Sequence, residues 1–372
     1  MREPGKRPLL IYVITTLGDG GAEREVARVT RVLQERSPFD VEICCLMGRG
    51  SFADETEKAG VKVTVLYESK KPWYVTAYAL IKYLRQCKPM IVHVHLARWG
   101  VIAAKLAGVP VVVLSVHNWM LKQAWHHMTL EKISFRLADR VIGVSEAISR
   151  QLVEEYGIPK KRVCTVMPAL DFSQCPDTDA DAKKAELGIP SDAPVIGNVG
   201  RLCEQKAQKY FVAAAAIILK TKPECRFLIL GEGPLRDELQ RQINDLGIAD
   251  RIHLLGFRED AREIIRVMDV SCLSSLYEGT PMAALEAMGY GKPVVITDVP
   301  GSEGVVIDGK TGFVAQPKDP SSLAGCILRL VEDRELAGRM GDEGRRLVTS
   351  KYSVESNLGQ LLPLYLGALN VC

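Results

Sequence analysis

Two series of short, continuous apolar runs, separated by one polar stretch, constrain the fold of this chain most. In each series the runs are rich in Val, Ile and Leu and alternate with longer stretches of helical pattern. Continuous rather than alternating hydrophobicity is typical of strands covered on both faces, and therefore of parallel sheets built from βα units. The first series comprises residues 9–16, 41–47, 61–67, 90–96, 109–116, 140–144 and 162–167, and the second comprises 194–200, 226–231, 251–257, 270–274, 293–297 and 313–315.

The polar, strand-poor stretch between Pro168 and Pro194 separates the two series. A chain of 372 residues is also too long for one ordinary core. The predicted fold class is therefore α/β, with two doubly wound, Rossmann-like domains. We expect an N-terminal domain over 1–170, a linker over 171–189 and a C-terminal domain over 190–352. Because ligands of such sheets bind beyond the carboxyl ends of the strands, the two domains are expected to face one central cleft.

The segment from Glu278 to Glu286 carries two carboxylates eight positions apart across an expected helix start. Thr280 is a good N-cap, and Pro281 suits the first helical position. The carboxylates then lie up to about 12 Å apart along the axis, whereas the pair in a retaining glycosidase lies about 5 Å apart. The spacing instead favours a ligand with hydroxyl-rich ends and anions in the middle, because free N–H groups at a helix N-terminus attract phosphate. A nucleotide diphosphate sugar has this layout.

With Arg201 and Lys206 upstream, this segment resembles the retaining glycosyltransferases of family four, whose members have the two-domain B-type fold (GT-B). The resemblance covers nearly the whole chain and rests on the order and spacing of several motifs. In the resembled fold the last helix crosses back onto the first domain, so residues 353–372 are expected to pack there. The motifs are Gly20-Gly21-Ala22-Glu23, His117, Val144-Ser145-Glu146, Gly200-Arg201-Leu202 with Lys206, Leu230-Gly231-Glu232-Gly233, and Glu278 with Glu286.

The resemblance implies a role for each candidate site residue. Arg201 and Lys206 would hold the pyrophosphate, where preorganised cations stabilise the charge of a departing nucleoside diphosphate. Glu286 would bind the ribose diol, while Glu278 and His117 would grip the sugar. The catalytic candidates are therefore His117, Arg201, Lys206 and Glu278. The nucleotide-sugar-binding candidates are Gly20, Gly21, Gly231, Gly256, Phe257, Thr280, Pro281, Met282 and Glu286, and Glu23 lies on the acceptor side.

Several of these motifs also have a purely structural interpretation. Residues 18–23 lack the G-x-G-x-x-G spacing of a dinucleotide site, and their glycines could form a simple turn. Gly231 could belong to a phosphate-binding turn or only to a helix start, and His117 could be a core histidine. The resembled family usually has glycine after its lysine, whereas this chain has Ala207, which could shift the loop slightly.

The sequence predicts no metal site and no required cofactor. His93, His95 and His117 could meet at adjacent strand ends, but no carboxylate or cysteine lies at a convincing spacing to complete a metal site. The aspartates within residues 177–181 offer a D-x-D pattern, yet no strand precedes them, and we interpret them as the solvated start of a helix. By resemblance, the arginine–lysine pair replaces a metal ion.

Composition bounds the cellular setting. Ten scattered cysteines without a C-x-x-C motif are typical of reduced thiols in a cytoplasmic protein. Residues 1–170 carry 25 Lys and Arg against 16 Asp and Glu, whereas residues 171–372 carry 23 against 29. With Lys70-Lys71-Pro72-Trp73-Tyr74, the basic first half fits peripheral contact with the cytoplasmic face of the inner membrane. A basic face that only aids solubility is the alternative, and we expect no nucleic-acid partner.

These observations lead to one functional hypothesis and two alternatives. The chain is expected to transfer a hexose or N-acetylhexosamine, with retention, from a nucleotide diphosphate sugar such as a UDP-sugar to a hydroxyl of a glycan or lipid-linked acceptor. On family grounds the setting is the assembly of bacterial cell-surface polysaccharide. No carboxylate is clearly placed as a nucleophile, so same-face attack assisted by the leaving phosphate is preferred. A sugar-nucleotide epimerase of the same fold and a non-catalytic nucleotide-binding protein remain the alternatives.

Overall fold

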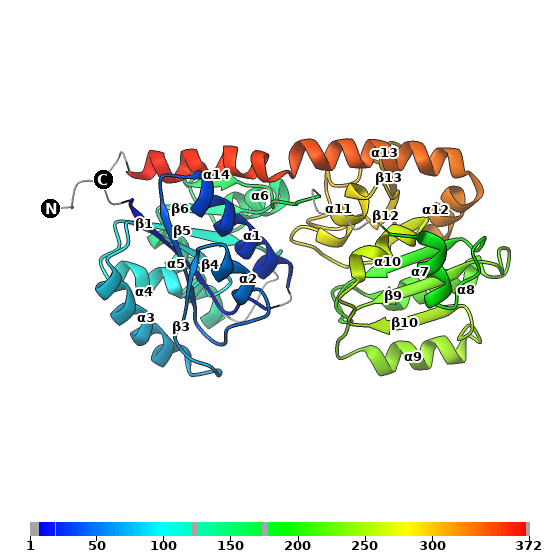
Figure 1. Ribbon diagram of the computed structural model, residues 1–372, viewed down its shortest axis with the longest axis horizontal. Helices are drawn as coiled ribbons and strands as arrows, with labels where there is room; N and C mark the ends of the chain where they lie inside the picture. Colours follow the sequence, from blue (N-terminus) through cyan, green and yellow to red (C-terminus); the bar gives the residue numbers. More distant parts are fainter. Residues whose placement is uncertain (1–6, 19, 121–124, 173–177, 370–372) are drawn as a thin grey trace. The chain divides into compact units, whose positions relative to one another are not determined.

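A computed structural model of the chain describes residues 7–18, 20–120, 125–172 and 178–369, without the side chains of residues 125–129 and 369. The chain divides into two compact units (Figure 1), the first formed by residues 1–170 and 352–372 and the second by residues 171–351. The thirteen strands in the described ranges form two sheets, and every strand pairing is parallel. Each predicted apolar run overlaps one of these strands, which confirms the α/β class with two Rossmann-like domains.

The first unit contains a seven-stranded sheet in the order β3-β2-β1-β4-β5-β6-β7. The strand order reverses between β1 and β4, so the topological switch point of a doubly wound sheet lies there. Its strands are β1 (Leu9–Ile14), β2 (Asp40–Cys45), β3 (Lys62–Val65), β4 (Ile91–His95), β5 (Val111–Val116), β6 (Arg140–Gly143) and β7 (Val163–Thr165). Its helices are α1 (Gly21–Arg36), α2 (Ala53–Lys58), α3 (Trp73–Cys87), α4 (Gly100–Leu106), α5 (Trp125–Leu137), α6 (Glu146–Glu154), the short 3₁₀ helix Lys160–Arg162 and α14 (Val354–Leu369).

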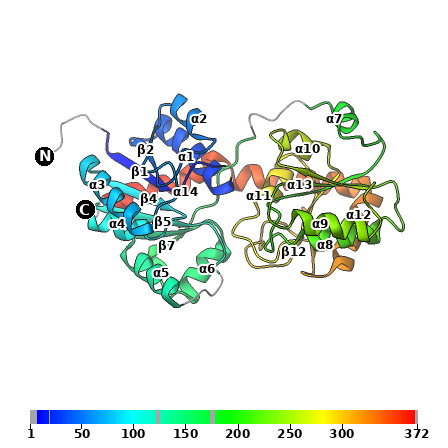
Figure 2. The ribbon, with the colours of Figure 1, turned by 90° about the horizontal axis from the view of Figure 1, so that it is seen from below.

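Strand β1 shows why the apolar runs are continuous. Leu10, Tyr12 and Ile14 point into a core that includes side chains of α1 and α14. Ile11 and Val13 point to the opposite face, into a core shared with α3, α4 and α6. Helices cover both faces of the sheet (Figure 2), and alternate side chains of a strand point to opposite faces. Every position of a central strand is therefore buried, and the sequence pattern loses its alternation.

The second unit contains a six-stranded sheet in the order β10-β9-β8-β11-β12-β13, with its switch point between β8 and β11. Its strands are β8 (Val195–Val199), β9 (Arg226–Leu230), β10 (Ile252–Gly256), β11 (Val270–Leu273), β12 (Val294–Thr297) and β13 (Gly312–Ala315). Its helices are α7 (Ala180–Glu186), α8 (Gln208–Ile218), α9 (Arg236–Asp245), α10 (Ala261–Val267), α11 (Met282–Gly289), α12 (Pro320–Glu332) and α13 (Arg334–Lys351).

Part of the expected linker, residues 171–189, is the helix α7. The Asp179 carboxylate caps this helix by accepting hydrogen bonds from the backbone N–H groups of Asp181 and Ala182, at 3.1 Å each. Lys183 then forms ion pairs of 2.9 Å with Asp260 and Glu263, at the start of α10. The aspartate pattern thus caps a helix of the second unit; its first member, at position 177, lies outside the described ranges.

Helix α11 begins one residue later than predicted. Pro281, expected as the first helical residue, is the N-cap with φ −77° and ψ 76°, and Thr280 precedes it. The Met282 N–H donates to the Thr280 carbonyl at 2.9 Å. These angles and this bond define an inverse γ-turn, in which the central residue is not helical. The expected helix start was wrong because proline fixes φ but leaves ψ free to form such a turn.

The connection from β8 to α8 contains a non-glycine residue in the left-handed conformation. Ala207 has φ 48° and ψ 44°, is buried, and directly precedes α8 as its N-cap. An L-residue is disfavoured in this region by about 1–2 kcal/mol, whereas glycine adopts it readily. The backbone here therefore suits the glycine that the resembled family usually has at this position, where this chain has Ala207.

Ala207→Gly should raise the free energy of unfolding by up to about 1 kcal/mol, because relief of the left-handed strain exceeds the chain entropy that glycine adds. Ala216→Gly, in the right-handed interior of α8, is the matched control and should lower the free energy of unfolding by about 1 kcal/mol. Urea unfolding of both variants measures the difference. Equal destabilisation at the two positions would show that the left-handed backbone is not strained.

Candidate functional site

The candidate residues of the second unit follow the strands of its sheet. Because all of these strands are parallel, their carboxyl ends share one edge. Lys206 follows β8 and Glu278 follows β11, the two strands that flank the switch point. The two side chains meet, with Nζ of Lys206 2.7 Å from Oε1 of Glu278. The structure therefore joins two residues to which the sequence analysis assigned separate roles.

The carboxylate of Glu278 is almost completely buried. Its side chain is 3% exposed, against 21% for Lys206. The Ser275 hydroxyl donates a second hydrogen bond to the same oxygen, Oε1, at 2.5 Å. Neither bond involves Oε2, which accepts no hydrogen bond from the described residues. A buried carboxylate needs a cation and hydrogen bonds to offset its lost hydration, so this pair also holds the ammonium group of Lys206 in one place.

Further hydrogen bonds tie together the loops that carry the ion pair. The Leu276 N–H donates to the Gln205 carbonyl at 2.8 Å, and Nε2 of Gln205 donates back to the Tyr277 carbonyl at 3.0 Å. The Ser274 hydroxyl donates to the Lys206 carbonyl at 3.1 Å. The loops after β8 and β11 therefore form one connected structure. Sequence reasoning missed Gln205, because a glutamine in a polar loop has no distinguishing spacing.

The glycines after β9 have a structural explanation. Gly231 has φ 132°, and a Cβ atom there would lie 2.2 Å from the Gly200 carbonyl oxygen. A Cβ atom on Gly233 would lie 2.2 Å from the Leu202 carbonyl oxygen. The Gly231 N–H also donates to the carbonyl of Gly256, which has φ 72°, at 2.8 Å. These glycines let the strand-end loops approach closely; their contact with a ligand stays a prediction.

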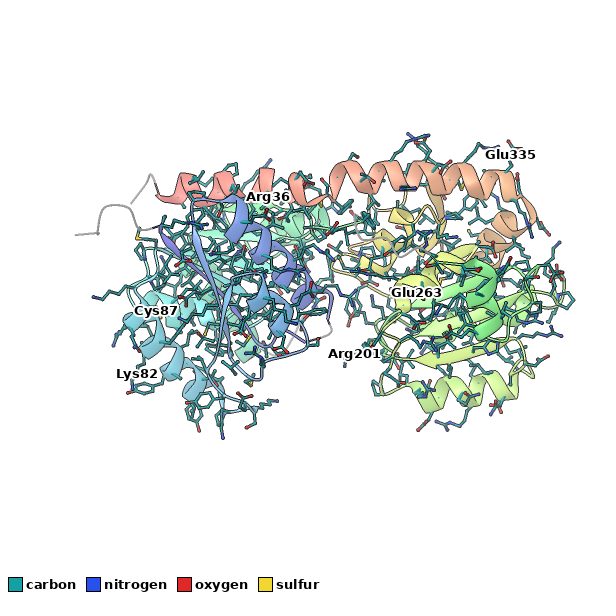
Figure 3. The ribbon with its side chains drawn as sticks, in the orientation of Figure 1. Arg36, Lys82, Cys87, Arg201, Glu263 and Glu335 are labelled. Atoms are coloured by element: carbon teal, nitrogen blue, oxygen red, sulfur yellow. The ribbon has the colours of Figure 1, made fainter. Side chains whose placement is uncertain are left out.

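The other candidates of the second unit differ in exposure. Arg201, labelled in Figure 3, is exposed, and its guanidinium group forms no hydrogen bond or ion pair with the part of the chain that the structure describes. Phe257 follows β10 and is 59% exposed. Residues 280–282 form the turn that leads into α11, whose first residue is Met282, and half-buried Glu286 lies one turn inside that helix. The roles of these residues stay predictions.

In the first unit, the glycine motif opens helix α1. Gly20 is the N-cap and Gly21 the first helical residue, and both are exposed. Glu23 lies in the first turn, and a Cβ atom on Gly20 would lie 2.2 Å from its Oε2. The Glu23 carboxylate therefore lies close over the glycine turn that follows β1.

His117 follows β5 and is largely buried, with 7% of its side chain exposed. Its Nε2 lies 2.7 Å from Nδ1 of His95, the last residue of β4, and its Nδ1 lies 3.8 Å from Oε2 of Glu25 on α1. Burial, with a smaller effect of the Arg98 charge, lowers the pKa of His117 to about 4. His117 is therefore neutral at pH 7, and its contact with Glu25 is not an ion pair. Of its two ring nitrogens, Nδ1 forms no hydrogen bond with the described residues.

Glu25 faces His117 from α1, and sequence reasoning missed it. Burial raises the pKa of its carboxyl group to about 7, while the charge of Arg28 and a hydrogen bond from the Ala169 backbone act in the opposite direction. A glutamate two positions after Glu23 on an amphipathic helix has the appearance of a surface residue. The sequence feature that could have identified Glu25 is its position one helical turn after the glycine motif at Gly20 and Gly21.

His93 and His95 alternate on β4 but differ in their contacts. Both ring nitrogens of His93 are used: Nδ1 is 2.6 Å from the Tyr365 hydroxyl and Nε2 is 2.8 Å from the Ser115 hydroxyl. His93 is therefore a core histidine. Within the described ranges, no group of three or more His, Cys, Asp or Glu residues is arranged to hold a metal ion.

The models of two protein families match successive parts of the chain. Residues 19–174 match Glycosyltransferase Family 4, and residues 179–347 match Glycosyl transferases group 1. The α-D-kanosaminyltransferase of Streptomyces kanamyceticus is 30% identical over 298 residues, which are 74% of this chain and 76% of that protein. The UDP-Gal:α-D-GlcNAc-diphosphoundecaprenol α-1,3-galactosyltransferase of Escherichia coli is 28% identical over 302 residues, which are 77% and 78% of the two chains.

Solved structures show the same fold. HepE of Anabaena, solved in complex with UDP and glucose, superposes with a TM-score of 0.85 at 21% identity, over 97% of this chain and all of that one. Sucrose-phosphate synthase from Thermosynechococcus elongatus superposes with a TM-score of 0.82 at 21% identity, over 98% of this chain and all of that one. The predicted two-domain B-type architecture is confirmed by these neighbours.

Lys206→Ala should lower the free energy of unfolding by about 1–3 kcal/mol, because Glu278 would stay buried without its cation. Adding Glu278→Gln, which removes the buried charge, should restore most of that loss. Lys209→Ala is the control, since among the described residues the Lys209 ammonium group forms an exposed 3.6 Å pair with Glu204 and a cation–π contact with Tyr210 at 5.6 Å, and it should change stability by less than about 0.5 kcal/mol. A double-mutant cycle by urea unfolding measures the coupling, and strictly additive effects would contradict the pairing.

Proposed function

Since the chain belongs to glycosyltransferase family four, we propose that it transfers a hexose or N-acetylhexosamine from a UDP-sugar to a hydroxyl of a glycan or lipid-linked acceptor. The transfer retains the anomeric configuration and serves cell-surface polysaccharide assembly. The observation that carries the proposal is the Lys206–Glu278 pair at the switch point of the second sheet. The name of the Escherichia coli relative, with UDP-Gal as donor and a diphosphoundecaprenol-linked acceptor, supports the donor and acceptor classes.

The two cations of the second unit suit a leaving nucleoside diphosphate. Breaking the sugar–phosphate bond builds negative charge on the pyrophosphate, and cations that are already in place stabilise it without reorganisation. Lys206 is such a cation, because Glu278 holds its ammonium group. Arg201 follows the same strand and is exposed, so it can bind the phosphates directly. We assign both to the pyrophosphate, and Glu286, on α11, to the ribose hydroxyls.

The sugar end of the donor needs acceptors for its hydroxyl groups. Oε2 of Glu278 and Nδ1 of His117 form no hydrogen bond with the described residues, and each can accept one from a hydroxyl. Glu278 already neutralises Lys206, which makes it a poor nucleophile. This favours same-face attack in which the leaving phosphate takes the proton of the acceptor hydroxyl.

The remaining candidates complete the proposed donor site. Gly20 and Gly21 would let the backbone after β1 approach the sugar and phosphates, and Glu23 would face the acceptor. Gly231 would lie near the phosphates, and residues 280–282 near the helix start that faces them. The backbone at Gly256 and Phe257 would hold the nucleobase.

The acceptor class also implies contact with a membrane surface. None of the helices in the described part of the chain is long and apolar enough to span a bilayer. Helix α3 and the loop before it nevertheless expose an aromatic–lysine surface: Trp73, Tyr74 and Tyr78 are 54%, 62% and 73% exposed, beside exposed Lys70, Lys71 and Lys82. Interfacial aromatics next to lysines are typical of proteins that bind anionic lipid head groups. We assign this surface to peripheral membrane contact.

Transfer should proceed in EDTA, because the proposed pyrophosphate ligands are Arg201 and Lys206 and not a metal ion. The measurement is turnover of UDP-sugars with acceptor glycolipids, with the anomeric configuration of the product read by NMR. Loss of turnover in EDTA that Mg²⁺ or Mn²⁺ restores would contradict the cationic pair. An inverted anomer would contradict same-face attack, and free epimerised sugar nucleotide would identify an epimerase.

Replacing Lys70, Lys71 and Lys82 by glutamine should weaken binding to anionic vesicles roughly 100-fold, since each lysine near such a surface contributes about 1 kcal/mol. Co-sedimentation with vesicles containing phosphatidylserine measures the effect, with phosphatidylcholine vesicles as the neutral reference. The control replaces Lys220, Lys310 and Lys351, three exposed lysines of the second unit. Equal losses in both triple variants would show that net charge, and not this surface, determines binding.

A further inference from the structure

Two polar atoms in the core of the first unit have no partner among the described residues. They are Nε2 of His95 and Oδ1 of Asn357, and both are buried. His95 is 5% exposed and Asn357, on α14, is 2% exposed. The remaining polar atoms of both side chains do form hydrogen bonds: Nδ1 of His95 with His117, and Nδ2 of Asn357, which donates to the Met167 carbonyl. Because buried polar atoms nearly always have a partner, counting ordered water, these two require an explanation.

Both atoms belong to residues that line one internal cavity. The cavity has a volume of about 20 Å³, and its other lining residues include Tyr12 and Glu25. One water molecule requires about 10–15 Å³ and two to four polar partners. The cavity has room for one water, and its lining residues His95, Asn357 and Glu25 offer the two orphaned atoms and a carboxyl group as polar partners.

The chemistry of these partners decides where the protons lie. An amide oxygen only accepts hydrogen bonds, and the Glu25 carboxyl group, whose pKa burial raises to about 7, keeps an accepting oxygen in either protonation state, so a water between Asn357 and Glu25 can direct its two hydrogens toward those residues. Its lone pair then remains for the N–H of a donor, which is Nε2 of His95. Burial holds the pKa of His95 well below its usual range, so the ring carries one proton. Nδ1 of His95 must therefore accept a hydrogen bond, and His117 donates it from Nε2 at 2.7 Å.

We propose that one water in this cavity links His95 to Asn357, and that His95 is a positioning residue which fixes the proton of His117 on Nε2. The Nδ1 lone pair of His117 is then the acceptor for a hydroxyl group of the donor sugar. This inference rests on the proposed function for the identity of the ligand. The proton arrangement itself does not depend on that function.

His95→Phe tests the proposal while keeping the ring that stacks on Tyr12, at 5.2 Å between ring centroids. In the wild type, long-range ¹H–¹⁵N NMR should show that His117 is neutral and carries its proton on Nε2. The signals of His117 are assigned by their loss in the His117→Asn variant. In His95→Phe the proton should move toward Nδ1, because Glu25 faces that nitrogen at 3.8 Å. The KM for the UDP-sugar should rise roughly five- to tenfold, while the affinity for UDP alone stays unchanged.

Two further variants separate positioning from packing. Asn357→Leu removes the acceptor beyond the water, and should shift the His117 tautomer in the same direction. Ser115→Ala is the matched control, because it removes a hydrogen bond of His93 on the neighbouring strand but leaves the His95–His117 pair intact. Its His117 tautomer and its KM should match those of the wild type.

The outcomes separate this inference from the proposed function. A wild-type His117 that carries its proton on Nδ1, or a tautomer that His95→Phe leaves unchanged, would overturn the positioning role whatever the activity. An equal rise in the KM for the UDP-sugar and in the Kd for UDP would likewise overturn it, since it would indicate general damage to the fold. A protein with the expected tautomers that transfers no sugar would refute the proposed function and leave the water-linked network standing.

Discussion

A lysine ammonium group held 2.7 Å from a buried carboxylate is the interaction on which the site of the second unit depends. Such a pair contributes little net stability, because each ion loses hydration on burial. Its effect is geometric. The carboxylate cannot stay buried without the cation, so the loops after β8 and β11 must keep the positions that bring them together, and the hydrogen bonds through Gln205 and Ser274 hold the same positions. The parallel topology makes this possible by placing the two strands side by side at the switch point.

The first unit buries polar groups by another means, since its central histidines are neutral. His93 and His95 lie on β4, His117 directly follows the neighbouring strand β5, and burial lowers the pKa of all three. Hydrogen bonds to side chains and water are enough to offset the lost hydration of a buried neutral ring, whereas a buried charged ring would need a carboxylate partner. Helix α14 supplies part of this network: the Tyr365 hydroxyl lies 2.6 Å from the Tyr12 hydroxyl and 2.6 Å from His93. The last helix is thus bound to the sheet by specific polar contacts as well as by apolar packing.

Sequence reasoning predicted the strands well and the contacts poorly, for a physical reason. Burial on both faces leaves a continuous apolar run at every parallel strand, so the strands could be located. Position at a strand end also predicted that residues such as Lys206 and Glu278 would share one edge. Their direct pairing spans 72 positions and depends on side-chain conformations that no local pattern encodes. Glu25 was missed because its burial depends on packing between α1 and the sheet, and the start of α11 was misplaced because proline permits both a helix and a γ-turn.

The contrast between Lys206 and Arg201 indicates how two cations on one loop can divide the proposed reaction. Arg201 is exposed, so binding a phosphate must order a long side chain, and this lost entropy reduces its net contribution. Lys206 is already ordered by Glu278, which Ser275 holds through the same oxygen, so its ammonium group is in place before the leaving group develops charge. The arginine is therefore suited to capturing the donor, and the lysine to lowering the barrier. One cation is thus fixed by the fold and partly offset by the Glu278 carboxylate, whereas the other keeps its full charge but must be ordered on binding.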